Sequence, residues 1–320
     1  MKQFVGPLLL SQGVRCWSVS QELRKDAPVR LGAKAEEIEA EFFRRLRDNH
    51  GLYELLQVLW GSLLIAAGAL MARRQGELIE LERGSFLDTS GTRLVFAARK
   101  RNSRNFRERR ARPVPKVIAD LLLKLQRMQE ELLSLGVINE KCGLFAFPRV
   151  HSPGELKVVS DKSCNELLDR FCDYFETERT EDNRRYYIRQ HQLRRFFAML
   201  FFWGNSYSGL ETLRWFLGHS DPEHLYRYIT ESTPGEVLKD VKVDFAIEQL
   251  RARHPSADQL AYAIQERFGV NMIELVDSEE LPGYVESLLL DSKLHIEPHF
   301  FNGHNGREYT ILIIVEECPR

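Results

Sequence analysis

The apolar run LWGSLLIAAGALMA at 59–72 restricts the folds open to this chain more than any other segment. It contains no charged residue, yet it is shorter than the roughly 20 residues that a helix needs to cross a bilayer. Such a run is typical of a helix buried inside a large core. The chain has 320 residues, 43% of them hydrophobic, which is enough to build that core.

The pattern around this run predicts an α+β fold that is mainly helical. Between Phe86 and Pro115 the hydrophobic period changes to two, with a turn at Ser90-Gly91, and this change predicts two or three short antiparallel strands. Apolar residues recur at helical spacing elsewhere. The helical segments expected before the tail are 33–49, about 52–81, 115–136 and, with interruptions, 165–231.

Pro234-Gly235 marks a boundary, after which the composition changes. Residues 1–235 carry 37 Lys and Arg against 30 Asp and Glu, whereas residues 236–320 carry 8 against 16, so the two parts have net charges of +7 and −8. A basic body suits a polyanion, and the acidic extension suits protein contact or intramolecular regulation. We expect the extension to contain three short helices (about 236–252, 256–268 and 282–290) and a β-hairpin around the Asn- and Gly-rich loop at 302–306.

The five cysteines are widely spaced and include no CxxC pair, so the sequence predicts neither a disulfide framework nor a zinc ribbon. The first residues, MKQFVGPLLLSQG, lack the pattern of a signal peptide. We therefore expect a cytoplasmic protein.

Ionisable residues surround a second apolar segment, FFAMLFFW at 196–203. His191 and Arg194 lie three residues apart ahead of it, so both project from one face of a helix whose other faces are anchored in the core. The next helix, LETLRWFL, ends at Gly218 and is followed by His219. Asp221-Pro222 is a strong start signal for a third helix, which carries Tyr226 and Tyr228.

The order H-x-x-R, then LGH, then a tyrosine nine residues later resembles the tyrosine recombinase (phage integrase) family. That family also has R-x-x-E-L at the end of an apolar helix, which here matches 74-RQGEL-78. It has a lysine in a β-hairpin followed by an R-x-V/I-P segment, which here matches Lys100 and 112-RPVP-115. The resemblance covers roughly residues 33–232.

The resemblance implies a mainly helical DNA breaking and rejoining domain at 33–233, after an N-terminal segment at 1–32 and before the extension at 234–320. It also implies a role for each matching residue. Tyr228 would attack phosphorus and form a 3′-phosphotyrosyl link, Lys100 would protonate the 5′ oxygen, and His191 would act as acid and base. The implied catalytic set is Arg74, Lys100, His191, Arg194, His219 and Tyr228.

These roles suit the residue types. Two arginines can hold the non-bridging oxygens of a phosphodiester with forked, permanently charged donors. His219 would donate a hydrogen bond to the same phosphate. The resemblance implies that the reaction needs neither metal nor ATP, and the sequence contains no GxxxxGK[ST] or HExxH motif. It further implies a homotetramer on double-stranded DNA and integration or recombination of a mobile genetic element.

The segment 99–112 has a net charge of +7 and can neutralise several phosphates. We expect DNA contact from its seven arginines, which are Arg99, Arg101, Arg104, Arg107, Arg109, Arg110 and Arg112.

Two residue choices stay open. Tyr226 competes with Tyr228 as nucleophile, although the spacing from His219 favours Tyr228. Arg73 competes with Arg74, and only the offset to Glu77 favours Arg74. The family usually has Thr-Gly in a TG-x-R pattern, whereas this chain has Met-Ala-Arg-Arg at 71–74.

Two other functions also stay open. The family places a helical core-binding domain ahead of the catalytic domain, and only residues 1–32 stand in its place here. A catalytically silent DNA-binding regulator or remnant of the same fold would account for that difference. A relaxase similar to type IB topoisomerases shares the same chemistry.

Overall fold

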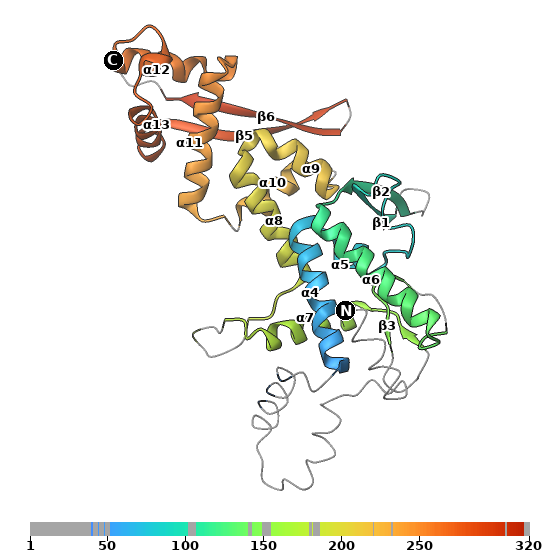
Figure 1. The fold of residues 1–320 in the computed structure, drawn as a ribbon. Helices are drawn as coiled ribbons and strands as arrows, with labels where there is room; N and C mark the ends of the chain where they lie inside the picture. The colour runs from blue at the N-terminus through green and yellow to red at the C-terminus, as the bar shows by residue number, and fades with distance from the viewer. Residues whose placement is uncertain are drawn as a thin grey trace. The chain divides into compact units, whose positions relative to one another are not determined.

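A computed structural model describes the chain except for several segments, and its described part is mostly helical with small antiparallel sheets, as the α+β prediction requires (Figure 1). The described residues are 40, 44, 48, 52–101, 107–139, 143–148, 155–178, 181, 186–219, 221–231, 233–304 and 306–316; side chains at 52, 53, 99–101 and 148 are not described. The N-terminal segment at 1–32 and most of the helix predicted at 33–49 lie outside this set.

The chain divides into two compact units, unit 1 (Met1–Arg194) and unit 2 (Arg195–Arg320). The sequence instead places a boundary at Pro234-Gly235, so the acidic extension shares unit 2 with the helices that precede it. The division between the units falls inside helix α8 (Gln190–Asn205).

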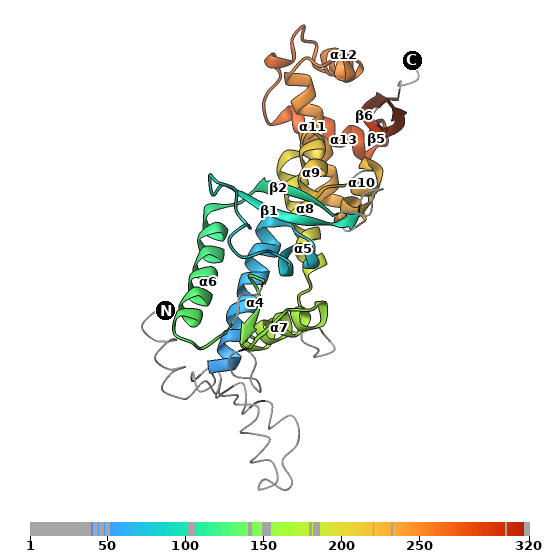
Figure 2. The same cartoon turned by 90° about the vertical axis from the view of Figure 1, so that its right-hand side faces the viewer.

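Helix α4 (Leu52–Met71) is the central helix of unit 1 and contains most of the apolar run. It packs against α6 (Lys116–Ser134) and α7 (Asp161–Tyr174) (Figure 2). Trp60 is buried, and its indole Nε1 donates a hydrogen bond to the Phe145 carbonyl at 2.8 Å. By length and composition, Glu54–Met71 is the one window among the described helices that could cross a membrane, but here it forms the core of unit 1.

The single helical stretch predicted from about 52 to 81 is wrong, because α4 ends at Met71 and a short helix, α5 (Gln75–Ile79), follows. Ala72 has φ +49°, in the left-handed region, and Arg74 is extended. The helical path therefore breaks at the Met71–Arg74 turn, although its residue types do not predict a break.

Two antiparallel strands, β1 (Arg93–Arg101) and β2 (Arg107–Pro113), occupy the segment where two or three were predicted. Their register runs from Arg93 opposite Pro113 to Ala97 opposite Arg109, and it shifts before Arg101. A second small sheet pairs β3 (Phe147–Pro148) with β4 (Leu156–Lys157), outside the segments predicted as helix or strand.

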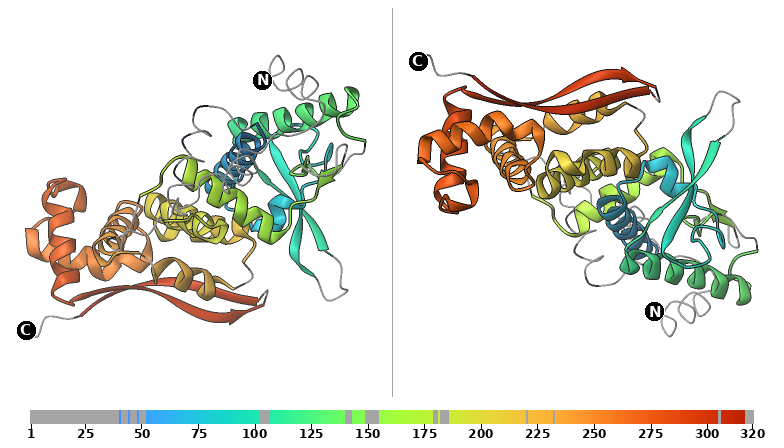
Figure 3. Two further views of the ribbon diagram at one scale, coloured as in Figure 1. Left: turned by 90° about the horizontal axis from the view of Figure 1, so that it is seen from below. Right: turned by 90° about the horizontal axis from the view of Figure 1, so that it is seen from above.

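Unit 2 continues from α8 through short helices to a long hairpin, close to the sequence prediction. The elements are η1 (Tyr207–Gly209), α9 (Leu210–Leu217), α10 (Pro222–Thr230), α11 (Gly235–Arg251), η2 (Pro255–Ala257), α12 (Asp258–Phe268), η3 (Ile273–Leu275), α13 (Glu280–Leu290), β5 (Leu294–Gly303) and β6 (Gly306–Val315). Figure 3 shows β5 and β6 paired side by side as a long two-stranded hairpin. Gly218 ends α9 with φ +68°, and the Asp221 carboxylate caps α10 by accepting from the Glu223 N–H at 2.9 Å, as predicted.

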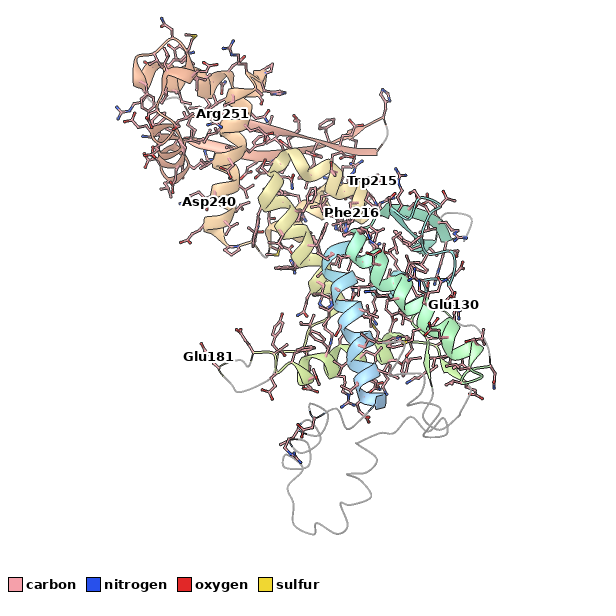
Figure 4. All side chains as sticks on the ribbon, in the orientation of Figure 1. Glu130, Glu181, Trp215, Phe216, Asp240 and Arg251 are labelled. Carbon is pink, nitrogen blue, oxygen red and sulfur yellow. The ribbon has the colours of Figure 1, made fainter. Side chains whose placement is uncertain are left out.

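Aromatic rings form much of the packing in unit 2. Tyr207 contacts Phe245 of α11, and Tyr226 contacts Phe300 of β5. On α9, Phe216 stacks on Phe197 with ring centroids 5.2 Å apart, whereas Trp215 is half exposed (Figure 4). Because the first two contacts join η1 and α10 to the extension, the composition boundary at Pro234 is not a packing boundary.

Candidate active site

The Met71–Arg74 turn of unit 1 accepts hydrogen bonds on three successive carbonyls. The Arg73 Nε donates to the Met71 carbonyl at 2.7 Å, and the Arg194 Nη1 donates to the Ala72 carbonyl at 2.5 Å. The Gln190 Nε2 donates to the Arg73 carbonyl at 3.4 Å. A helix C-terminus leaves carbonyls without intrahelical partners and carries partial negative charge, and α4 has no basic residue in its last turn. Guanidinium groups supply that charge instead.

Arg74 is the N-cap residue of α5 and pairs with Glu77 through both backbone and side chain. Its N–H donates to Glu77 Oε2 and its Nη1 donates to Glu77 Oε1, each at 3.1 Å. The Arg74 side chain is 30% exposed, whereas the Glu77 side chain is buried. The R-x-x-E motif therefore forms a capping interaction in which the carboxylate is fixed and the arginine reaches the surface.

Four guanidinium groups lie around this turn, and we refer to Arg73, Arg74, Arg112 and Arg194 as the arginine cluster. Burial lowers the pKa of Arg73 to about 9, Glu77 opposes that change, and the charges of Arg194, Arg112 and Arg74 lower the pKa further. Burial also lowers the pKa of Arg112. Guanidinium groups can donate forked hydrogen bonds to an oxyanion.

His191 is exposed on the first turn of α8, one turn before Arg194. Lys100 lies on β1 within the stretch between Ala97 and Arg101 where the register shifts, and its side chain is outside the described part. Unit 1 thus brings Arg74 and Arg194 to one turn and places His191 on the same helix as Arg194.

His219 and Tyr228 form a second group, in unit 2. Their ring centroids are 6.0 Å apart. Arg195, which the sequence reasoning missed, donates from Nε to the Tyr228 carbonyl at 3.1 Å, and its guanidinium lies 5.1 Å from the centre of the Tyr228 ring. Arg195 directly follows Arg194 in sequence, but nothing in the motif distinguishes it from a surface arginine.

Tyr226 and Tyr228 have different surroundings on α10. The Tyr226 hydroxyl lies 3.2 Å from that of Tyr207, and its ring contacts Phe202 and Phe300. Burial raises the pKa of Tyr226 and that of Tyr207. A hydroxyl in this setting is a poor nucleophile, which is consistent with the sequence preference for Tyr228.

Three arginines of the β1–β2 hairpin whose side chains are described pair with carboxylates. Arg107 pairs with Glu80, and Arg109 lies 3.8 Å from Glu82. Arg110 pairs with Glu108 at 2.8 Å. Exposed ion pairs contribute little to stability, so these arginines can exchange their partners for phosphates at low cost. Of the other predicted contacts, Arg112 is buried, Arg99 and Arg101 lie on β1 with side chains not described, and Arg104 is outside the described residues.

Comparison with models of known protein families finds no match. Comparison with curated protein sequences finds no significant relative.

Proposed function

We propose that this chain is a tyrosine recombinase-type enzyme that cuts and rejoins double-stranded DNA through a 3′-phosphotyrosyl intermediate on Tyr228. The hydrogen bond from Arg194 to the Ala72 carbonyl carries this proposal, because it joins the H-x-x-R motif to the turn that presents Arg74 across 122 residues of sequence. An accidental match of short motifs would not explain why Arg194 contacts the turn that presents Arg74.

The arginine cluster supports the phosphate-binding part of the proposal. Arg74 and Arg194 would hold the non-bridging oxygens, whose charge grows in the transition state. The charge around the Met71–Arg74 turn is fixed by buried hydrogen bonds, so little reorganisation is needed when the phosphate binds. His219 would add a hydrogen bond to the same group.

The chemical step follows from the remaining residues. The Tyr228 oxygen forms a bond to phosphorus while the bond from phosphorus to the 5′ oxygen breaks. The tyrosine proton passes to a base, for which His191 is our candidate, and Lys100 donates a proton to the leaving 5′ oxygen. Rejoining is the reverse of this reaction, because the phosphotyrosyl bond conserves the energy of the broken one.

The β1–β2 hairpin supports DNA contact through its exposed arginines. On this proposal the protein acts in the cytoplasm as a homotetramer on DNA, in site-specific recombination or integration of a mobile element. The acidic extension would contact protein rather than DNA.

A suicide DNA duplex tests the proposal, built from DNA that is recovered bound to the protein and nicked next to the cleavage point. We expect a covalent protein–DNA adduct with the wild type and with Tyr226→Phe, and none with Tyr228→Phe. A wild type that binds this DNA but never forms an adduct would instead indicate a catalytically silent DNA-binding regulator. Relaxation of supercoiled plasmid by a monomer without a defined site would favour a topoisomerase-like relaxase.

A further inference from the structure

Arg73 lies next to the motif arginine, but the motif gives it no role. Its side chain is deeply buried, with 1% of the residue exposed. Its Nε is bonded to the Met71 carbonyl, and its guanidinium lies 4.8 Å from the centre of the Phe96 ring. A cation placed over an aromatic face and bonded to a helix-end carbonyl is fixed in position.

Burial of this guanidinium is costly unless negative charge compensates it. Glu77 supplies such charge, but it also bonds Arg74 and acts on Arg112. The charges that act on the pKa of Arg73 include those of one carboxylate and of three further guanidinium groups. An oxyanion bound by the cluster would add negative charge beside these guanidinium groups.

The same turn connects Arg73 to the two motif arginines. Arg194 donates to the Ala72 carbonyl, which follows the Met71 carbonyl held by Arg73 and lies two residues before Arg74. Ala72 occupies the left-handed region that favours glycine, so the turn needs support from its surroundings. Arg73 provides part of that support.

We infer that Arg73 is a positioning residue of the anion site, which fixes the turn that presents Arg74 and adds a positive charge beside the oxyanion held by Arg74 and Arg194. The identity of that oxyanion as a DNA phosphodiester rests on the proposed function. The predicted affinity for free phosphate does not rest on the proposed function, because it can be measured without DNA cleavage.

Phosphate titration of the full-length protein, at fixed ionic strength in chloride, tests this inference. Arg73→Gln keeps a donor for the Met71 carbonyl but removes the charge, and we expect phosphate affinity to fall about tenfold. Arg73→Lys keeps the charge and is expected to bind within about threefold of the wild type at neutral pH. Arg83→Gln is the matched control, because the Arg83 side chain is 8% exposed and faces Glu130 outside the cluster.

A purely structural role for Arg73 gives a different result. Arg73→Gln and Arg83→Gln would then both lower the melting temperature, and the folded Arg73→Gln protein would bind phosphate as the wild type does. That outcome, or a wild type that binds no phosphate, overturns the inference.

The pH profile of Arg73→Lys provides a second test if Arg73→Gln does not fold. A buried lysine loses its proton more readily than a buried arginine, so its phosphate affinity should decline at a lower pH than that of the wild type. Coincident profiles would contradict the inference. A wild type that binds phosphate in the expected way yet forms no DNA adduct would refute the proposed function and leave the role of Arg73 standing.

Discussion

The arginines of the Met71–Arg74 turn and those of the β1–β2 hairpin are the same residue type in opposite settings. At the turn, Arg73 and Arg194 are buried and bonded to backbone carbonyls that cannot move away. On the hairpin, Arg107 and Arg109 are exposed and face the glutamates at 80 and 82. The first group is held in one geometry, whereas the second can change partners.

On the proposed function, this difference separates two tasks of DNA cleavage. Transition-state stabilisation requires charges whose positions are set before the substrate arrives. Backbone attraction requires only charge at the surface, and it depends strongly on salt. The buried arginines suit the first task and the exposed ones suit the second, so substitutions in the two regions should differ in size and kind.

The largest effect is expected for Glu77→Gln. Glu77 is the buried carboxylate among the arginines, and removal of one partner from a buried ionic group commonly costs about 3 kcal/mol or more. Denaturant unfolding should show this loss, and added phosphate should recover part of it by replacing the missing negative charge. Unchanged unfolding would mean that the cluster is solvated rather than buried.

A substitution that crowds the contact between α4 and α8 should destabilise the same region less than Glu77→Gln does. A Cβ added at Gly68 of α4 would overlap the Gln190 amide and the Leu193 side chain, so Gly68→Ala should cost about 2 kcal/mol and weaken phosphate binding by shifting the first turn of α8. Gly204→Ala is the matched control, since a Cβ there meets nothing within 4 Å. It should be neutral or slightly stabilising in the same unfolding experiment. Equal behaviour of the two variants would show that α4 and the start of α8 are not tightly packed.

Much of the fold could be predicted from local signals. Pro115, Gly218, Asp221-Pro222 and the Asn-Gly loop at 302–306 fix element ends through backbone preferences that do not depend on the rest of the chain. The break at Ala72 could not be predicted in this way. Alanine favours helix, and the turn is held by the side chains of Gln190 and Arg194, more than a hundred residues away in sequence.

Sequence reasoning could propose candidate site residues only where a motif marks them. Arg74, His191, Arg194, His219 and Tyr228 follow a known order, and the structure places them on two separate units. The roles of Arg73 and Arg195 depend on a ring and on carbonyls from other elements. The spacing of residues in the sequence does not predict such contacts.

The position of the extension was also outside what composition could indicate. Its charge differs from that of the preceding region, but Arg307 of β6 pairs with Glu223 of α10, and Phe300 contacts Tyr226. A few specific contacts therefore decide where a compact unit ends, and the net charge of a segment does not predict these contacts.

On the hairpin, the double substitution Arg107→Gln and Arg109→Gln should leave the free energy of unfolding almost unchanged, because both pairs are exposed. The effect should appear in DNA binding, where loss of two phosphate contacts lowers the slope of log affinity against log salt by about 2. Arg253→Gln removes an exposed arginine that pairs with Glu274 in unit 2 and should not change the slope. An unaltered slope in the double variant would exclude the hairpin from the DNA interface.

The smallest effect is expected for Glu80→Gln. Glu80 lies three residues from Glu77, but its side chain is exposed whereas that of Glu77 is buried. Glu80 and Arg107 are 40% and 37% exposed at their side chains, so loss of their ion pair should cost less than about 1 kcal/mol. Without this carboxylate, Arg107 can pair with a DNA phosphate, and DNA affinity at low salt should rise about twofold. Glu274→Gln breaks the exposed pair with Arg253 and should have a similar effect on unfolding but none on DNA affinity. Weaker DNA binding by Glu80→Gln would mean that Glu80 orders the hairpin for binding rather than competing with DNA for Arg107.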